Sequence, residues 1–589
     1  MNAAPSPAPG RAPSPAASRA PSPESVGRAI LDRLGIAEDP LVGADPVSFL
    51  RSLAAAVPSL VKNPTATAAA SGRSAIGLAA AVRAAAGRAV GANTPAPLAP
   101  AIGDKRFLDP AYEGNPLYFL LEQEYLLTSQ LVTELLDAAE LDAAQDVKAR
   151  FAAKFMLDAL APTNNLFGNP AAIREAFDTG GKSVFKGAKN MLSDLRHNGG
   201  WPSQVDSSGF EVGVNMAATT GAVVYRSDLI ELIQYAPQVK QVHAVPLLFC
   251  PPWINKYYIM DLAPGKSLIE WAVQHGHTCF AISYRNPDAS MRDLDFADYM
   301  HQGPLDAVRV VREITGAPEV NTISVCLGGT LTAIALAHNA AIGDHSIKSA
   351  TFLNTLTDFS TPGALGIFTD EATIAGLEKQ MDKKGFLDSD KMAHTFDALR
   401  ANDLVFAYVV NNWLLGKKPP SFDLLVWNKD STRMPARMHS RYLRACYLHN
   451  EFARGEFEID GELLDPGKID IDTYVLAAVD DHIVPWVSAY KTTQLLGGDS
   501  RFVLSTSGHI AGIVNPPSPK ARHWSNDTLP ADPLEWKDNA QLHVGTWWED
   551  WTRWIAKQGG PKVAAPRRLG SNDHPPIEDA PGSYVRTRA

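Results

Sequence analysis

One short segment constrains the fold of this chain more than any other, because it joins a strand, a reactive side chain and two glycines. The β-branched run 322–325 leads into Cys326, and Gly328 and Gly329 follow at the start of an apolar, helix-compatible stretch. This order is typical of a nucleophile elbow, a sharp strand-to-helix turn that presents a catalytic nucleophile. The turn requires small residues two positions before and after the nucleophile, and Ser324 and Gly328 meet this requirement. The alternative is a buried core cysteine, since free cysteines are among the most buried residues.

Apolar runs alternate with helical stretches after residue 210, and this pattern predicts the sheet that would hold the elbow. Continuous apolar strands separated by helices are typical of a parallel sheet covered on both faces. The long interval between residues 354 and 472 is rich in aromatic residues, and we expect it to form a cap over the site. The predicted strands are residues 223–225, 245–250, 277–284, 322–325, 349–354, 472–479 and 501–505.

The acid and the base that would complete the elbow follow two later strands. Asp480 and Asp481 come directly after the run 472–479, at the strand end where a parallel sheet presents its functional groups. His509 lies in a glycine-flanked loop after the last strand. The order nucleophile, acid, histidine is that of the α/β-hydrolase fold. The pattern alone does not separate Asp480 from Asp481, and we interpret the neighbouring His482 as structural.

The same elbow predicts where a negatively charged oxygen would be stabilised during catalysis. The backbone N–H of Leu327, the residue after the nucleophile, is the first expected donor. The second should come from the loop that follows the strand 245–250. That loop begins with two prolines, which have no N–H, so Trp253 or Ile254 must supply the donor, and we choose Ile254.

A cysteine in the elbow favours acyl transfer over ordinary ester hydrolysis. A thiolate next to a histidine is strongly nucleophilic and exchanges readily with thioesters. The acyl-enzyme that it forms is itself a reactive thioester. This chemistry suits transfer from an acyl-CoA to a chosen acceptor other than water.

The first third of the chain has a different composition and predicts a different architecture. Residues 1–24 are mostly Ala, Pro, Ser and Gly, the composition of a disordered tail. Residues 25–209 predict a mainly helical N-terminal domain, with apolar residues at helical spacing over 117–160. Residues 210–589 would then form the α/β-hydrolase catalytic domain, with the cap inserted at about 358–468.

Composition excludes several classes of protein. The chain is 45% apolar and 20% charged, as globular proteins are, and its formal charge of −10 argues against general nucleic-acid binding. The four cysteines have neither metal-ligand spacing nor a dense disulfide pattern. We find no signal-like segment and no run of about 18 apolar residues. We therefore expect a reduced, cytoplasmic protein without a transmembrane segment.

Several segments besides the elbow resemble polyhydroxyalkanoate synthases, over roughly residues 106–517. In that family the elbow reads G-x-C-x-G-G, and this chain has Ser324 in place of the first glycine. The family's acid directly precedes His-Ile-Val-Pro, which selects Asp481 over Asp480. The other segments that carry the resemblance are residues 107–110, 210–213, 229–235, 251–258, 284–287, 402–404, 409–412 and 422–427.

The resemblance implies a function and a role for each residue. Cys326 would carry the growing chain as a thioester, and His509 would deprotonate it. Asp481 would either orient the histidine or activate the 3-hydroxyl of the incoming monomer. The substrate would be an (R)-3-hydroxyacyl-CoA, and the reaction would lengthen a polyester and release CoA without a metal or a separate cofactor. Such synthases act as homodimers at the surface of cytoplasmic polymer granules.

The expected monomer length rests on smaller features of the same resemblance. A single long chain fits the one-subunit classes. Ala511, two residues after the histidine, resembles short-chain synthases of class I, whereas residues 198–205 and 581–585 look more like medium-chain members of class II. We favour class I, with 3-hydroxybutyryl-CoA as the first choice of substrate.

Two other functions remain as alternatives. A thioesterase or a polyester depolymerase could use the same fold, but such enzymes normally carry serine in the elbow. A non-catalytic granule-coat protein could keep the fold and lose the chemistry, but it would lack a member of the triad, and none is missing here.

Overall fold

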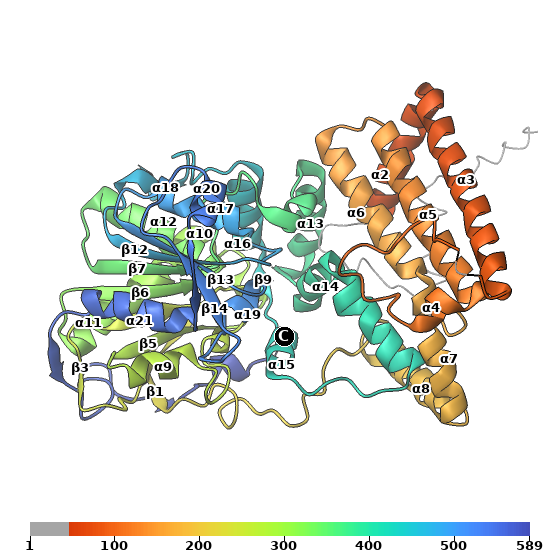
Figure 1. Ribbon diagram of the computed structural model, residues 1–589. Helices are drawn as coiled ribbons and strands as arrows, with labels where there is room; N and C mark the ends of the chain where they lie inside the picture. Colours follow the sequence, from red (N-terminus) through yellow and green to blue (C-terminus); the bar gives the residue numbers. More distant parts are fainter. Residues whose placement is uncertain (1–45, 93, 589) are drawn as a thin grey trace, which may run out of the picture.

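The computed structural model describes residues 46–92 and 94–588 (Figure 1). The predicted tail, residues 1–24, and the first part of the predicted helical domain lie outside the described residues. A broad sheet and its helices occupy one side of the molecule, and a group of N-terminal helices occupies the other, with further helices between them (Figure 1).

The sheet has eleven strands in the order β15-β14-β13-β12-β7-β6-β4-β5-β2-β1-β17. The strands from β13 to β5 in this order are parallel, and the outer ones pair antiparallel. They are β1 (Gly221–Arg226), β2 (Ile230–Tyr235), β4 (Leu247–Cys250), β5 (Cys279–Tyr284), β6 (Val320–Val325), β7 (Ile347–Leu353), β12 (Asp472–Ala478), β13 (Ser500–Ser505), β14 (Arg522–Ser525), β15 (Gln541–Val544) and β17 (Glu578–Asp579).

The α/β-hydrolase fold predicted from the sequence is confirmed, and every predicted strand is present. The prediction of a parallel sheet needs one correction. The outer strands pair antiparallel, so the sheet is mixed. The strands β2, β14, β15 and β17 were not predicted. The last three are polar, short or only partly buried, whereas β2 is fully buried but carries Glu231 and Gln234 among its apolar residues. A separate antiparallel pair joins β3 (Gln241–His243) to β16 (Lys562–Ala564).

The central strands are apolar because both faces of the sheet are covered. Every residue of β4 and of β6 is buried, and neighbouring residues of one strand belong to different core clusters, as Leu247 and Leu248 do. The helix α12 (Leu327–Ile342) is apolar on all sides and buried from Leu327 to Asn339, so it fixes the position of the elbow. The other helices of this half are α9 (Leu268–Gln274), α10 (Phe296–Met300), α11 (Asp306–Thr315), α17 (Trp486–Tyr490), α18 (Thr492–Leu495), α19 (His509–Ile513), α20 (Pro533–Asp538) and α21 (Trp547–Gln558).

The N-terminal part is helical, with helix starts that the sequence encodes. Asn115 and Asp142 accept hydrogen bonds from backbone N–H groups of the first turns of α5 and α6, which stabilises those helix ends. The helix pair predicted over residues 117–160 is confirmed. The helices are α2 (Pro46–Lys62), α3 (Pro64–Ala89), α4 (Pro110–Gly114), α5 (Pro116–Ala138), α6 (Ala143–Leu160), α7 (Pro170–Asp178) and α8 (Lys182–His197).

Between β7 and β12 the chain leaves the sheet and forms a set of short elements that we call the cap. It contains α13 (Glu371–Lys384), β8 (Phe386–Leu387), α14 (Ser389–Leu399), α15 (Asp423–Lys429), β9 (Met434–Pro435), α16 (Ala436–Arg441), β10 (Glu458–Ile459) and β11 (Glu462–Leu463). Three π-helical turns, Asn402–Phe406, Val409–Leu414 and Tyr442–Leu448, lie among them.

The N-terminal helices pack against this cap. The rings of Phe151 and Phe368 meet edge to face at 5.4 Å, and the Asn190 amide donates to the Asn412 carbonyl at 3.0 Å. A Cβ on Gly187 of α8 would lie 1.8 Å from the Trp413 carbonyl oxygen. The glycine therefore permits a backbone contact between the two regions that a side chain would prevent.

Candidate active site

Cys326 lies at a strained turn between β6 and α12. Its backbone has φ 51° and ψ −120°, a conformation uncommon for a residue with a side chain and frequent at functional sites. A Cβ on Gly328 would lie 2.4 Å from the Cys250 carbonyl oxygen and 2.5 Å from that of Pro251. The second small position of the elbow therefore needs glycine, because the backbone of the loop after β4 fills the space.

The serine in place of the usual first glycine fits without distorting the elbow. The Ser324 hydroxyl donates to the Thr332 hydroxyl at 2.9 Å, and the Thr332 hydroxyl donates to the Gly328 carbonyl at 2.8 Å. All of these groups are buried, and burying a hydroxyl without a hydrogen bond costs free energy. The two bonds avoid that cost for Ser324 and Thr332. They also join the end of β6 to the first turns of α12.

His509 and Asp481 form a buried pair facing the elbow. The His509 Nδ1 lies 2.6 Å from the Asp481 Oδ2, and the Asp481 side chain is 0% exposed. The other carboxylate oxygen accepts the backbone N–H groups of Ile483 at 2.9 Å and Val484 at 2.8 Å. Both oxygens of Asp481 therefore have fixed donors.

The imidazole of His509 shares the cavity with the Cys326 sulfur, which acts on the pKa of the ring. Burial by itself lowers the pKa of His509, but the facing Asp481 carboxylate and the Cys326 sulfur raise it, and the net direction is well above the usual histidine value. A protonated imidazole held against sulfur is the environment in which a cysteine acts as a nucleophile. The structure thus brings Cys326, His509 and Asp481 together as the sequence predicted.

The remaining predicted residues differ in their surroundings. Asp480 is exposed, and its backbone N–H donates to the Ser507 carbonyl at 3.0 Å. His482, which we interpreted as structural, lines the same cavity as Cys326. Burial first and the nearby Arg400 second lower the pKa of His482, so its ring is neutral at pH 7. His509 itself opens the short helix α19 and is not in a loop.

Two residues at the end of β7 support the site, and the sequence analysis missed their roles. Asn354 has φ 46°, and its amide donates to the His509 backbone carbonyl. The Thr355 hydroxyl donates to the Cys326 carbonyl at 3.2 Å. Polar residues directly after a buried strand were the available signal.

A cavity of about 380 Å³ opens over the sulfur. Apolar side chains of the cap form much of its wall, and a polar rim includes Asp397, Arg400 and His482. Burial raises the pKa of Asp397 to about 7, although the Gln204 amide, which donates to it at 2.8 Å, acts in the opposite direction. The apolar cap residues at the cavity are Leu356, Phe359, Leu365, Phe396, Leu404, Phe422, Leu424, Leu425, Trp427, Tyr442 and Tyr447.

The other three cysteines have a different environment. Cys250, Cys279 and Cys446 are buried, whereas Cys326 is half-buried. Burial raises the pKa of the Cys250 thiol to about 12 and also raises the pKa of Cys279 and Cys446. These three thiols are therefore inert at neutral pH, which leaves Cys326 as the cysteine that can react.

The expected oxyanion donors lie beside the sulfur. Leu327 is the first residue of α12, where N–H groups have no acceptor within the helix. In the chain as described, neither the Leu327 nor the Ile254 N–H donates a hydrogen bond to another group. Both residues line the cavity with Cys326, whereas the Trp253 side chain is buried in the core.

Two known families match overlapping parts of the chain. Residues 103–272 match the family described as the N-terminus of poly-beta-hydroxybutyrate polymerase (PhaC), and residues 245–516 match the alpha/beta hydrolase fold. Three relatives are similar over most of their length. The poly(3-hydroxyalkanoate) polymerase subunit PhaC of Cupriavidus necator is 44% identical over 493 residues, covering 82% of this chain and 83% of that protein.

The other two relatives carry similar names. Poly(3-hydroxyalkanoate) polymerase of Methylorubrum extorquens is 43% identical, covering 85% of this chain and 84% of that protein. Poly(3-hydroxyalkanoate) polymerase 1 of Ectopseudomonas oleovorans is 40% identical, covering 83% of this chain and 88% of that protein. Identity at this level over nearly the whole length shows the family. The chain belongs to the poly(3-hydroxyalkanoate) polymerases, acyltransferases that form polyester.

Proposed function

We propose that this enzyme polymerises (R)-3-hydroxyacyl-CoA, with 3-hydroxybutyryl-CoA as the preferred monomer, through a thioester on Cys326. One observation carries the proposal: a half-buried cysteine at a strained elbow shares an apolar cavity with a histidine that is paired to a buried aspartate. Acyl transfer through a thiolate needs a nucleophile, a base and a site that excludes water. Cys326 and His509 supply the first two in this cavity, and apolar side chains of the cap line it.

The reaction proceeds in two transfers. The Cys326 thiolate attacks the acyl-CoA carbonyl, the carbon–sulfur bond to CoA breaks, and the departing CoA thiolate takes a proton from the His509 imidazolium. The neutral imidazole then takes the proton from the 3-hydroxyl of the incoming monomer. The oxygen of that hydroxyl attacks the thioester that joins the chain to Cys326. An ester bond forms and the Cys326 thiolate is released beside the imidazolium. Leu327 and Ile254 stabilise the oxyanion in both transfers.

Asp481 acts in this scheme by orienting His509. The geometry of Asp481 supports this role. One carboxylate oxygen accepts a hydrogen bond from the His509 imidazole, the other accepts hydrogen bonds from two backbone N–H groups, and the side chain has no exposed surface. A carboxylate without exposed surface is poorly placed to take a proton from a substrate hydroxyl. It fixes the tautomer and the direction of the ring.

The preference for a short monomer, and with it class I, rests on the cavity wall. Ala511, two residues after His509, lines the cavity together with bulky cap residues such as Phe396 and Phe422. These rings take up room in the cavity, which would favour a methyl side group on the monomer. Longer monomers would have to displace them.

The enzyme is proposed to act as a homodimer at the surface of polymer granules in the cytoplasm. The N-terminal helices α7 and α8 present exposed aromatic and aliphatic side chains that would contact an apolar polymer. No helix in the described part of the chain has the length and apolar character needed to cross a bilayer. The exposed residues are Phe177 of α7 and Val184, Phe185, Met191, Leu192 and Leu195 of α8, with Phe167 just before α7.

The test measures CoA release and polymer mass from (R)-3-hydroxybutyryl-CoA with the wild type and with Cys326→Ala. We expect polymer from the wild type and none from the variant. Release of free 3-hydroxybutyrate without polymer would instead support a thioesterase, and activity only on longer monomers would overturn the class I preference. Inactivity on all monomers would support a granule-coat role.

A further inference from the structure

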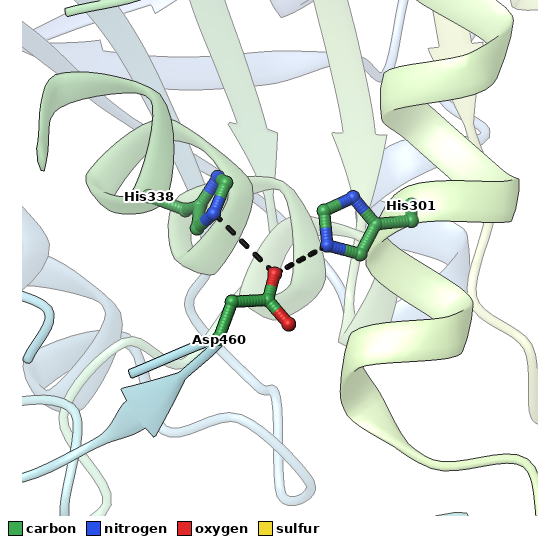
Figure 2. A group of neighbouring side chains, drawn as sticks. All are labelled: His301, His338 and Asp460. Atoms are coloured by element: carbon green, nitrogen blue, oxygen red, sulfur yellow. Dashed lines mark hydrogen bonds and ion pairs between the residues drawn. The ribbon is translucent and has the colours of Figure 1, made fainter. Parts of the chain in front are cut away.

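Two histidines and an aspartate converge at the far end of α12, away from the catalytic cavity. They come from distant parts of the chain: His301 begins a π-helical turn, His338 lies near the C-terminal end of α12, and Asp460 forms the turn between β10 and β11 (Figure 2). Their nearest ligand atoms all lie within 4.8 Å of one another. In the part of the chain that the structure describes, they form the single such group of three.

The distances leave room for an ion between the three side chains. The His301 Nε2 lies 2.5 Å from the Asp460 Oδ2, and the His338 Nε2 lies 3.6 Å from the same oxygen. Zinc binds imidazole nitrogen and carboxylate oxygen at about 2.0–2.2 Å, so tetrahedral ligands lie about 3.4 Å apart. The distance from the His338 Nε2 to the Asp460 Oδ2 already matches this value. The exposed His301 side chain would have to move by about 1 Å for its Nε2 to match as well.

His338 provides an independent observation that points to a ligand. The residue is 5% exposed, its Nδ1 has no hydrogen-bond partner, and its Nε2 points at Asp460 beyond hydrogen-bond distance. A buried imidazole nitrogen without a hydrogen-bond partner, as Nδ1 is here, is costly. Binding a cation through Nε2 would compensate part of that cost.

The three segments hold their side chains in place before an ion binds. Asp460 and Gly461 have φ 55° and 84° in the tight turn of the hairpin, and a left-handed turn of this kind fixes the direction of the Asp460 side chain. The backbone leaves helical geometry at Gly303, two residues after His301. His301 and Asp460 are both exposed, so an ion can arrive from solvent and keep one water ligand.

We propose that His301, His338 and Asp460 bind one divalent transition-metal ion, with Zn²⁺ as the first choice. The site fastens the last hairpin of the cap to α12. Two nitrogens and one carboxylate oxygen select Zn²⁺ over Mg²⁺ or Ca²⁺, which require mostly oxygen ligands. The site lies about 17 Å along the helix from the first residue of α12, so the ion acts on stability and not on the acyl transfer.

The test uses full-length, untagged protein that carries Cys326→Ala, so that the reactive thiol does not bind the ion. Zn²⁺ and Co²⁺ binding is followed by equilibrium dialysis and by the visible spectrum of Co²⁺, and melting temperatures are compared with Mg²⁺ added. We expect one bound ion, a tetrahedral Co²⁺ spectrum, and a rise in melting temperature of a few degrees with Zn²⁺ alone.

Matched variants decide whether the binding occurs at this site. Asp460→Asn keeps the left-handed turn, which asparagine tolerates, and His301→Gln changes an exposed side chain; each should weaken Zn²⁺ binding at least tenfold. His543→Gln removes one ring of the stacked pair His523–His543, whose centroids are 4.9 Å apart, and should change nothing. Absence of Zn²⁺ binding, or binding that both ligand variants leave intact, overturns the proposal.

Discussion

The two ends of α12 carry two histidine–aspartate pairs with nearly equal contacts and different surroundings. The His509–Asp481 pair, at the N-terminal end, spans 2.6 Å with side chains 8% and 0% exposed, and the His301–Asp460 pair, at the other end, spans 2.5 Å with 45% and 44% exposed. Water screens the exposed pair, and such pairs contribute about 0–1 kcal/mol to stability. In the buried pair the carboxylate changes the pKa of its histidine. Burial therefore decides which pair can do chemistry.

The largest test of this comparison is Asp481→Asn. Without the carboxylate, burial lowers the pKa of His509 and only the Cys326 sulfur opposes it, and the ring loses the acceptor that fixes its tautomer. We expect polymerisation to fall about 10³-fold or more, measured as the initial rate of CoA release. Asp460→Asn is the matched control and should retain activity within twofold. Equal losses in both variants would contradict the comparison.

A third histidine shows what burial does without any carboxylate. His439 is fully buried in the cap, neither of its nitrogens has a partner, and burial lowers its pKa to about 3. The unfolded chain binds a proton near pH 6.5, whereas the folded protein stays neutral there. Stability therefore falls as the pH drops below 6.5, by about 2 kcal/mol at pH 5.

The measurement compares urea unfolding of the wild type and of His439→Leu at pH 7 and pH 5. Other titrating groups contribute equally to both proteins, so the difference isolates His439. We expect the wild type to lose about 2 kcal/mol more than the variant between the two pH values. A parallel loss would mean that the imidazole is already protonated or hydrated when folded.

A smaller effect is expected from Asn354, which holds His509 from the backbone side. Asn354→Ala removes the amide that donates to the His509 carbonyl and should reduce kcat about tenfold with little change in KM. Because φ is 46° at this position, alanine also introduces strain. Asn354→Gly separates the two causes: it relieves the strain and should stay as slow as the alanine variant if the hydrogen bond is responsible.

The smallest effect should come from the exposed pair. His301→Gln is expected to leave the rate of CoA release within twofold and, in buffer treated with a chelator, to change the unfolding free energy by less than about 0.5 kcal/mol. A loss of activity comparable with that of Asp481→Asn would show that exposure is not what separates the two pairs.

The sequence predicted what depends on local pattern. The elbow could be recognised because its strand, nucleophile and glycines are contiguous, and the catalytic order because Asp481 and His509 each follow a strand. The edge strands β14 and β15 could not, since polar strands resemble loops. His482 and Asn354 could not be assigned either, because only the packed chain shows that one lines the cavity and the other supports His509. The grouping of His301, His338 and Asp460 depends entirely on topology.

The packing of the N-terminal helices on the cap has a consequence for motion. Lys148 contacts Thr373, Gln204 donates to the Leu404 carbonyl, and the Trp201 and His394 rings stack at 4.4 Å. All of these contacts join the helical region to the element that covers the sulfur. If the N-terminal helices and the cap move together as one rigid body, the cap can lift from the sheet while all three contacts stay intact. The polyester could then leave beneath a moving body much larger than the cap alone.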